Sequence, residues 1–238
     1  MILSAMSERS SQTRDLVNLP YPDRQTAGQA LAGLLGDFRD KTDVIILALP
    51  RGGVPVAKEI SSALGAPLDL LLVQKVGLPG HEELAMGAIA SNNIMVWNKA
   101  IRGKIKTGSS EIDSAIRKAR NELQRRKETY RGHRPEPELK NRIVILVDDG
   151  VATGATMRAA IDAVRLQQPE RIIVAVPVAP PDTVDLLRET ADEIVCPATP
   201  EPFYGVAEWY LDFAQLTDEA VRELLHAVSA EGTDRPGK

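Results

Sequence analysis

Two acids and a loop of small residues follow an apolar run in the second half of the chain. The run Val144–Val147 leads into Asp148 and Asp149, and after Gly150 come Val151, Ala152, Thr153, Gly154, Ala155 and Thr156. A helix that begins after such a loop presents free N–H groups and a positive dipole end to a phosphate. Carboxylates repel phosphate, so the two acids suit the hydroxyls of an attached sugar and attract Mg²⁺ through water. The segment predicts a sugar-phosphate site; the alternative is an ordinary turn capped by Asp and Thr.

A second glycine loop lies near the end of an earlier apolar run. Leu49–Val54 contains Arg51, Gly52 and Gly53. It repeats the anion-binding pattern and adds a guanidinium for bidentate contact with phosphate. Alone, a tight turn with a surface arginine would look the same. The sequence has no G-x-G-x-x-G after a strand and no G-x-x-x-x-G-K-[ST], so dinucleotide and P-loop sites lack their residues.

A third segment, Lys75–Gly87, holds three glycines and one proline, and its residues 75–86 have no strand or helix signal. Such a stretch is either disordered or a functional lid. His81, Glu82 and Glu83 are its acid/base candidates, with a solvated loop as the alternative. We favour Glu83, because we expect the apolar residues 84–86 to pack and hold it in place.

The pattern over residues 144–156 resembles the thirteen-residue motif of type I phosphoribosyltransferases, which bind phosphoribosyl pyrophosphate (PRPP). The resemblance implies that Asp148 and Asp149 hold the ribose hydroxyls and that Val151–Thr156 hold the 5′-phosphate. It also implies that the Arg51–Gly53 loop binds pyrophosphate, with a cis peptide bond at Pro50–Arg51. The third segment would then close over PRPP, with Lys75 facing pyrophosphate and Glu83 as the candidate acid or base.

Further matches make the chain look like a bacterial branch of this family over residues 21 to about 226. They are Asp23-Arg24, Glu83–Ala88 and Trp209–Phe213. Hypoxanthine-guanine enzymes of the family usually have an Asp where this chain has Ala152, and the Ala-Thr-Gly form is more similar to adenine phosphoribosyltransferases. An acid or base must then come from elsewhere, and the acceptor base stays open.

Continuous apolar runs alternate with segments whose apolar residues recur at helical spacing. This alternation predicts a mostly parallel sheet flanked by helices. With the resemblance, the expected fold is the type I phosphoribosyltransferase fold, with a helical insertion and a C-terminal hood. Strands are expected at 43–49, 68–74, 143–147, 172–178 and 194–196, and a hairpin at 87–91 and 94–97. Helices are expected from Asp23 to about Leu35 and at 54–64, 109–130, 155–166, 182–189 and 217–228.

One domain is expected over residues 21–229, with an insertion at 100–135, a hood at 197–229, and flexible tails at 1–20 and 230–238. Five of the nine aromatic residues fall within 203–213. They could stack a nucleobase, but a local hydrophobic cluster is the favoured interpretation. Helix 109–130 could belong to the hood or to a dimer contact, and the sequence leaves the choice open.

Composition and charge limit the classes of protein to which the chain could belong. The 238 residues carry a net charge of −4 and one cysteine, so we expect neither a general nucleic-acid binder nor a disulfide. Residues 102–142 hold 13 Lys and Arg against 6 Asp and Glu, which is typical of a solvated helix face or a partner surface. No apolar run suits a membrane helix and no secretory signal is visible, so a cytoplasmic protein is expected.

The leading hypothesis is a Mg²⁺-dependent enzyme that transfers the phosphoribosyl group from PRPP to a small nitrogen acceptor. A PRPP- or nucleotide-sensing regulator is the second, and a phosphoribosyl hydrolase the third. No nucleic acid or membrane partner is expected, and a homo-oligomer is left open.

Overall fold

The computed structural model describes residues 17–91, 93–98, 103, 109–132 and 134–233, apart from the side chains of residues 82, 83 and 228–233. Its centre is a parallel five-stranded sheet in the order β2-β1-β6-β7-β8. The strands are β1 (Val44–Ala48), β2 (Leu68–Leu70), β6 (Ile143–Val147), β7 (Arg171–Ala175) and β8 (Glu193–Val195). The expected parallel sheet is confirmed. Strand 68–74 is not continuous, because β2 ends at Leu70 and the next strand belongs to a second sheet.

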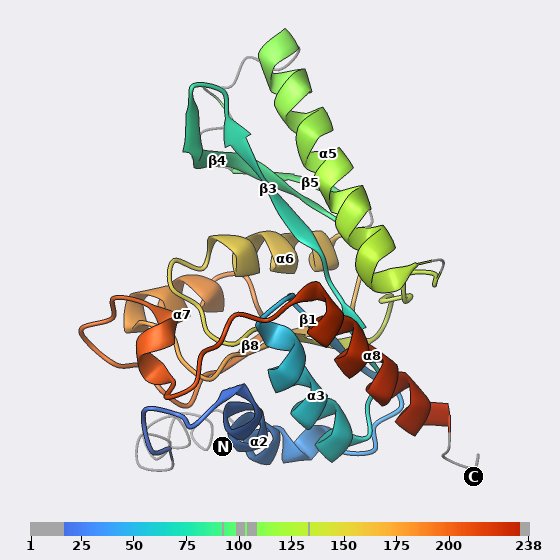
Figure 1. The fold of residues 1–238 in the computed structure, drawn as a ribbon, viewed down its shortest axis with the longest axis vertical. Coiled ribbons are helices and arrows are strands. Elements are labelled where there is room, and N and C mark those ends of the chain that lie inside the picture. The colour runs from blue at the N-terminus through green and yellow to red at the C-terminus, as the bar shows by residue number, and fades with distance from the viewer. Residues whose placement is uncertain (1–16, 92, 99–102, 104–108, 133, 234–238) are drawn as a thin grey trace.

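Helices cover both faces of this sheet (Figure 1). They are α2 (Arg24–Leu34), α3 (Gly53–Leu64), α6 (Ala155–Arg165), α7 (Pro181–Arg188) and α8 (Asp218–Thr233), with short 3-10 helices η2 (Gly36–Phe38) and η3 (Val206–Trp209). Alternate residues of β1 point to opposite cores: Ile46 packs with α3 and α8, and Leu47 packs with α6 and α7. The buried strands therefore read as continuous apolar runs.

A second, antiparallel sheet of three strands stands off the body with a long helix beside it (Figure 1). Its strands are β3 (Val73–Leu78), β4 (His81–Ala90) and β5 (Met95–Trp97), and the helix is α5 (Ser110–Arg131). We call these four elements the arm. The expectation that Lys75–Met86 lacks strands was wrong, since β3 and β4 pair across a turn at Gly80, which has φ +80°. The β4–β5 hairpin is confirmed.

An ion pair between a buried arginine and a half-buried aspartate fastens the arm to the body. Arg131, at the end of α5, donates to both carboxylate oxygens of Asp69 on β2, at 2.9 and 2.8 Å. It also donates to the carbonyls of Leu70 and Pro135 and is only 5% exposed. The last helix also differs from expectation, because α8 continues to Thr233 and so includes part of the stretch expected to be a flexible tail.

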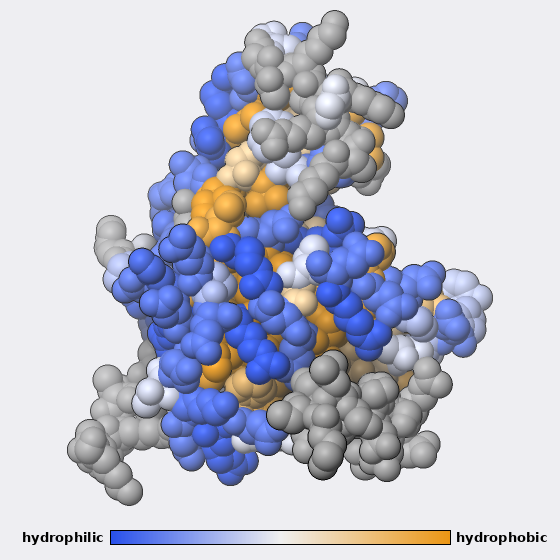
Figure 2. Space-filling view, turned by 180° about the vertical axis from the view of Figure 1, so that it is seen from behind, coloured by the Kyte–Doolittle hydropathy of each residue, from blue (hydrophilic) through white to orange (hydrophobic). Residues whose placement is uncertain are grey.

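Seen from behind, the body is mainly hydrophilic, and hydrophobic residues gather where the arm meets it (Figure 2). No helix among the described residues is long and apolar enough to span a bilayer.

Candidate functional site

The two glycine loops meet at the carboxyl ends of neighbouring strands. β1 and β6 pair in parallel with Ala48 opposite Val147, and each strand leads directly into its loop. The chain turns one way from β1 to β2 and the other way from β6 to β7, so the loops flank the switch point of the sheet, where ligands of α/β proteins bind. A Cβ atom added to Gly53 would lie 2.5 Å from the Val147 carbonyl oxygen. Glycine permits this close approach of backbones.

Both acids have little exposure to solvent at this point. Burial, and then the neighbouring charge of Asp149, raise the pKa of Asp148 well above its usual range. The pKa of Asp149 is also raised by burial, and Arg24 opposes that shift. The Asp148 carboxylate accepts a hydrogen bond of 2.9 Å from the Asp149 amide. The pair therefore resists carrying two full negative charges.

Arg24 and the C-terminal segment hold Asp149 from outside the motif. The Nε of Arg24 donates to Asp149 Oδ2 at 2.7 Å, and both side chains are nearly buried, at 12% and 13% exposed. Tyr210 donates its hydroxyl to the backbone oxygen of Asp149 at 2.5 Å. Sequence reasoning noticed Asp23-Arg24 and Trp209–Phe213 but connected neither with Asp149. These partners lie 125 and 61 positions from Asp149, and no local pattern indicates the contact.

The loop from Val151 to Thr156 has the form expected of a phosphate loop. Gly154 has φ +72° and precedes α6, and no side chain caps that helix in the described structure. The Ala152 carbonyl accepts a hydrogen bond of 2.6 Å from Thr183, while Thr153 is exposed. The first N–H groups of α6 and the Thr153 hydroxyl are therefore available to an anion.

Arg51 lies beside the N-terminus of α8. The Pro50–Arg51 peptide bond is cis, as the resemblance implied. Arg51 Nη1 is 3.7 Å from Asp218 Oδ1, and this oxygen also accepts a hydrogen bond of 2.5 Å from the Tyr130 hydroxyl. Arg126 donates to the Pro50 carbonyl at 3.3 Å. A cavity of about 320 Å³ lies between Arg51 and residues 215–219. The arm helix α5 and α8 thus both contact the loop that carries Arg51.

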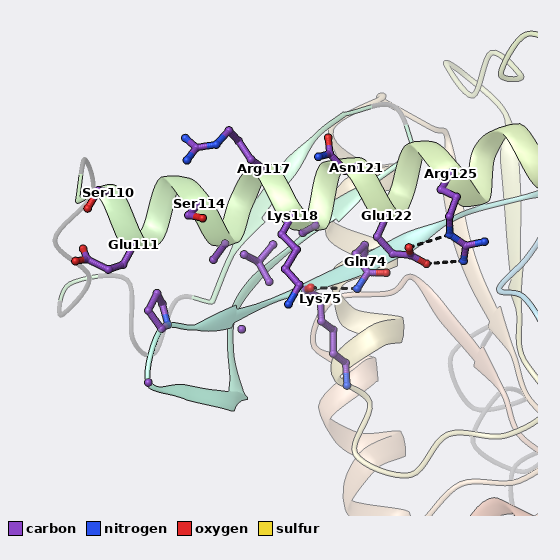
Figure 3. A pocket seen from close by; sticks show the side chains of 16 residues that line it. Gln74, Lys75, Ser110, Glu111, Ser114, Arg117, Lys118, Asn121, Glu122 and Arg125 are labelled. Atoms are coloured by element: carbon purple, nitrogen blue, oxygen red, sulfur yellow. Dashed lines mark hydrogen bonds and ion pairs between the residues drawn. The ribbon is translucent and has the colours of Figure 1, made fainter.

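Lys75 and Glu83 lie on the arm. Lys75 is exposed on β3 and lines a groove of about 1280 Å³ between β3 and α5. Figure 3 shows Lys118 reaching from α5 toward β3, while Lys75 points away from α5. No ion pair or hydrogen bond of the described residues joins the Lys75 amine to Arg51 or to the acid pair. Glu83 is in β4, but its side chain lies outside what the structure describes.

The packing expected after Glu83 is only partly found. Met86 is fully buried, whereas Leu84 is 44% exposed. The two residues are two apart and would share a face of a regular strand, but the pairing shifts between them: Val76 is opposite Gly87 and Gly77 is opposite Ala85, which leaves Met86 in a bulge. Leu84 therefore cannot hold Glu83 in place as expected.

The aromatic residues of 203–213 pack mainly on one another. The rings of Phe203 and Trp209 stack with centroids 6.1 Å apart, and those of Tyr210 and Phe213 lie 5.0 Å apart. Tyr204 differs, being 81% exposed. These contacts favour the local cluster over a base-stacking surface for every member except Tyr204.

The chain is similar to known proteins in sequence and in fold. The family model described as the phosphoribosyl transferase domain matches residues 22–213. Proteins from two Mycobacterium tuberculosis strains, each named provisionally as a phosphoribosyl transferase, are 42% identical over 201 residues. The alignment covers 84% of this chain and 45% of theirs, so the chain spans about half the length of these curated relatives. A crystal structure of TT1426 from Thermus thermophilus is similar, with 42% identity and a TM-score of 0.76, covering 86% of this chain and 97% of that one.

Proposed function

Since the chain belongs to the phosphoribosyltransferase family, we propose that it transfers the 5-phosphoribosyl group from PRPP to a nitrogen of a small acceptor, a nucleobase. The observation that carries the proposal is the junction of the two glycine loops at the acid pair. Backbones that approach as closely as those at Gly53 and Val147 bring two anion loops and two acids to one place. PRPP has a phosphate at one end, a pyrophosphate at the other and ribose hydroxyls between them, which is the same order of groups.

Each part of the site has a proposed role. The loop from Val151 to Thr156 holds the 5′-phosphate, and the acid pair accepts hydrogen bonds from the ribose hydroxyls. The Gly52 and Gly53 amides and Arg51 hold the pyrophosphate. When the C1′–oxygen bond breaks, negative charge grows on pyrophosphate, and fixed donors lower the barrier by meeting that charge.

The arm supplies the remaining groups in this proposal. Lys75 reaches pyrophosphate only if the arm moves toward the body, and such closure also excludes water from C1′. The acceptor nitrogen forms its bond to C1′ and loses its proton to a base, for which Glu83 is the candidate. Ala152 cannot serve, because it has no titratable group.

We propose that Mg²⁺ arrives with PRPP. The described residues contain no cluster of three or more His, Cys, Asp or Glu that could hold a metal ion. These residues fit an ion carried on the substrate, with the acids contacting it through water. When bound, Mg²⁺ supplies positive charge to the leaving pyrophosphate.

The test is pyrophosphate release with PRPP, Mg²⁺ and a panel of purine and pyrimidine bases. Replacing Arg51 or Lys75 with Ala should lower turnover at saturating PRPP by about 10²-fold. Arg188→Ala is the matched control, because this exposed arginine pairs only with Asp185 on its own helix among the described contacts. Tight PRPP binding without release for any base would contradict the transferase and favour a regulator. Release without an acceptor would favour a hydrolase.

A second test concerns the acid pair. Replacing Asp149 removes the partner of Arg24 as well as a proposed ribose ligand, so a double Asp148→Ala/Asp149→Ala variant is expected to lose stability. Asn at both positions retains the shape and is the better probe. PRPP affinity should fall strongly in a variant that remains folded, and unchanged affinity would refute the ribose role.

A further inference from the structure

One arginine outside both glycine loops joins three parts of the site. Arg24 donates from Nε to Asp149 at 2.7 Å and from Nη1 to the Ala214 carbonyl at 3.0 Å. Its guanidinium also lies 3.8 Å from the centre of the Phe213 ring. We infer that Arg24 is the positioning residue of the ribose site, holding the Asp149 carboxylate in place and fastening the C-terminal segment over it. The inference rests on the proposed function, because it assumes that Asp149 faces the ribose of PRPP.

The position of the Asp149 carboxylate depends on the Arg24 contact. The carboxylate lies against Gly52 so closely that a Cβ atom there would overlap it. It is thus confined between the pyrophosphate loop and Arg24, in a nearly buried place where an unpaired charge would be costly. Arg24 binds the Oδ2 atom of this carboxylate. Without Arg24 the carboxylate would lose its positive partner and its fixed direction.

The same guanidinium reaches the hood. Arg24 begins α2, where Asp23 caps the helix by accepting a hydrogen bond of 2.7 Å from the Thr26 amide. The chain just before this cap pairs with the hood, since the Tyr21 amide donates to Trp209 and the Leu211 amide donates to Tyr21, each at 2.8 Å. The fixed backbone on both sides sets Arg24 between the hood and the acid pair.

Arginine can make all three contacts seen at position 24, and lysine cannot. The planar guanidinium offers several N–H donors in fixed directions and can stack on an aromatic ring at the same time. A lysine at position 24 keeps the positive charge beside Asp149 but cannot make the ring contact and both hydrogen bonds in this geometry. Arg24→Lys should therefore rescue part of what Arg24→Met loses.

The experiment compares the affinities of PRPP and of inorganic pyrophosphate, each with Mg²⁺, by titration calorimetry. In Arg24→Met the PRPP affinity should fall about 10-fold or more, because a charged hydrogen-bond partner of the ribose acid is lost. Pyrophosphate affinity should fall clearly less than PRPP affinity, because pyrophosphate lacks the ribose hydroxyls that the acids are proposed to bind. Arg24→Lys should lie between Arg24→Met and the wild type for PRPP.

Arg165→Met is the matched control. Arg165 also binds one carboxylate and one carbonyl, donating to Asp192 and to Thr190 at 2.9 Å each, but it lies at the far end of α6. This control should leave both affinities unchanged. If Arg24→Met fails to fold, Phe213→Leu removes the ring under the guanidinium and should still lower PRPP affinity more than pyrophosphate affinity.

The outcomes distinguish failure of the proposed function from failure of the positioning role of Arg24. A wild type that binds neither ligand would contradict the proposed function itself. A wild type that binds both, with unchanged PRPP affinity in folded Arg24 variants, would overturn the positioning role alone. Equal losses for PRPP and pyrophosphate would also overturn it, because they would indicate a general structural role for Arg24.

Discussion

Gly53 packs against the backbone at the end of β6 so closely that no side chain fits there. An added Cβ atom would lie 2.5 Å from the Val147 carbonyl oxygen and 2.9 Å from the Asp148 Cα atom, both backbone atoms at the end of β6. Close-packed interiors do not tolerate such contacts, so Gly53→Ala must separate the loops by roughly 1 Å. The Val147 oxygen also accepts a hydrogen bond of 2.8 Å from the Leu49 amide, and the shift would weaken it.

Overpacking and a weakened hydrogen bond together cost about 1–4 kcal/mol, and the lower chain entropy of unfolded Ala offsets about 0.5–1 kcal/mol. We expect a net loss near 2 kcal/mol, which lowers the melting temperature by about 4–8 °C for a domain of this size. Pyrophosphate affinity should fall about 10-fold or more if this loop binds pyrophosphate as proposed, because a misplacement of about 1 Å would disturb the positions of its donors.

Thermal unfolding and pyrophosphate calorimetry test this prediction, with Gly33→Ala as the control. Gly33 lies on the exposed side of α2 with nothing within 4 Å of an added Cβ atom, so Ala there should stabilise the protein by about 0.5–1 kcal/mol. A Gly53→Ala protein with the same melting temperature and the same pyrophosphate affinity as the wild type would refute the close approach of the two loops.

Three other predictions concern polar groups with little exposure to solvent. Burial raises the pKa of Asp148 in the folded protein, so the ionised carboxylate lowers the free energy of unfolding as pH rises above the usual Asp range. Asp148→Asn should therefore raise the free energy of unfolding at pH 7 but hardly at pH 4. Equal effects at both pH values in denaturant titrations would contradict this. Desolvation raises the pKa of the half-buried Cys196 thiol to about 12, so a thiol reagent at pH 8 should label folded protein much more slowly than unfolded protein, and equal labelling rates would contradict the raised pKa. Arg131→Met should cost about 3 kcal/mol in urea unfolding, since it strands Asp69, and a loss below about 1 kcal/mol would show that this ion pair does not secure the arm.

The body of the fold was predictable because its signals are local. β6 is fully buried and every residue is apolar, and the helix after it shows a 3.6-residue spacing. Start and stop signals were also readable, as at Asp23, which caps α2, and Gly65, which ends α3 with φ +68°. Each signal lies within a few residues of the element it defines.

The β3–β4 hairpin of the arm was not predictable, because long-range packing stabilises it. The β3–β4 segment contains glycines and a proline that normally disfavour strands. Val76 and Met86 are nevertheless buried at 1% and 0% exposed, in the same core as Ile112, Ala119 and Leu123 of α5. The partner helix lies more than twenty residues further along the chain, so local spacing carries no sign of it.

The candidate site itself shows why sequence reasoning finds the acids but misses Arg24. Two adjacent acids at the end of a buried strand disfavour folding, since burial raises the pKa of both. Such unfavourable groups are typical of functional sites, and their residue types are visible in the sequence. The compensating contacts, Arg24 from α2 and Tyr210 from the hood, depend on the completed fold. Residues that oppose folding are therefore visible in the local sequence, whereas the residues that compensate for them are found only in the folded structure. For this reason the proposed ribose site is best tested at Arg24.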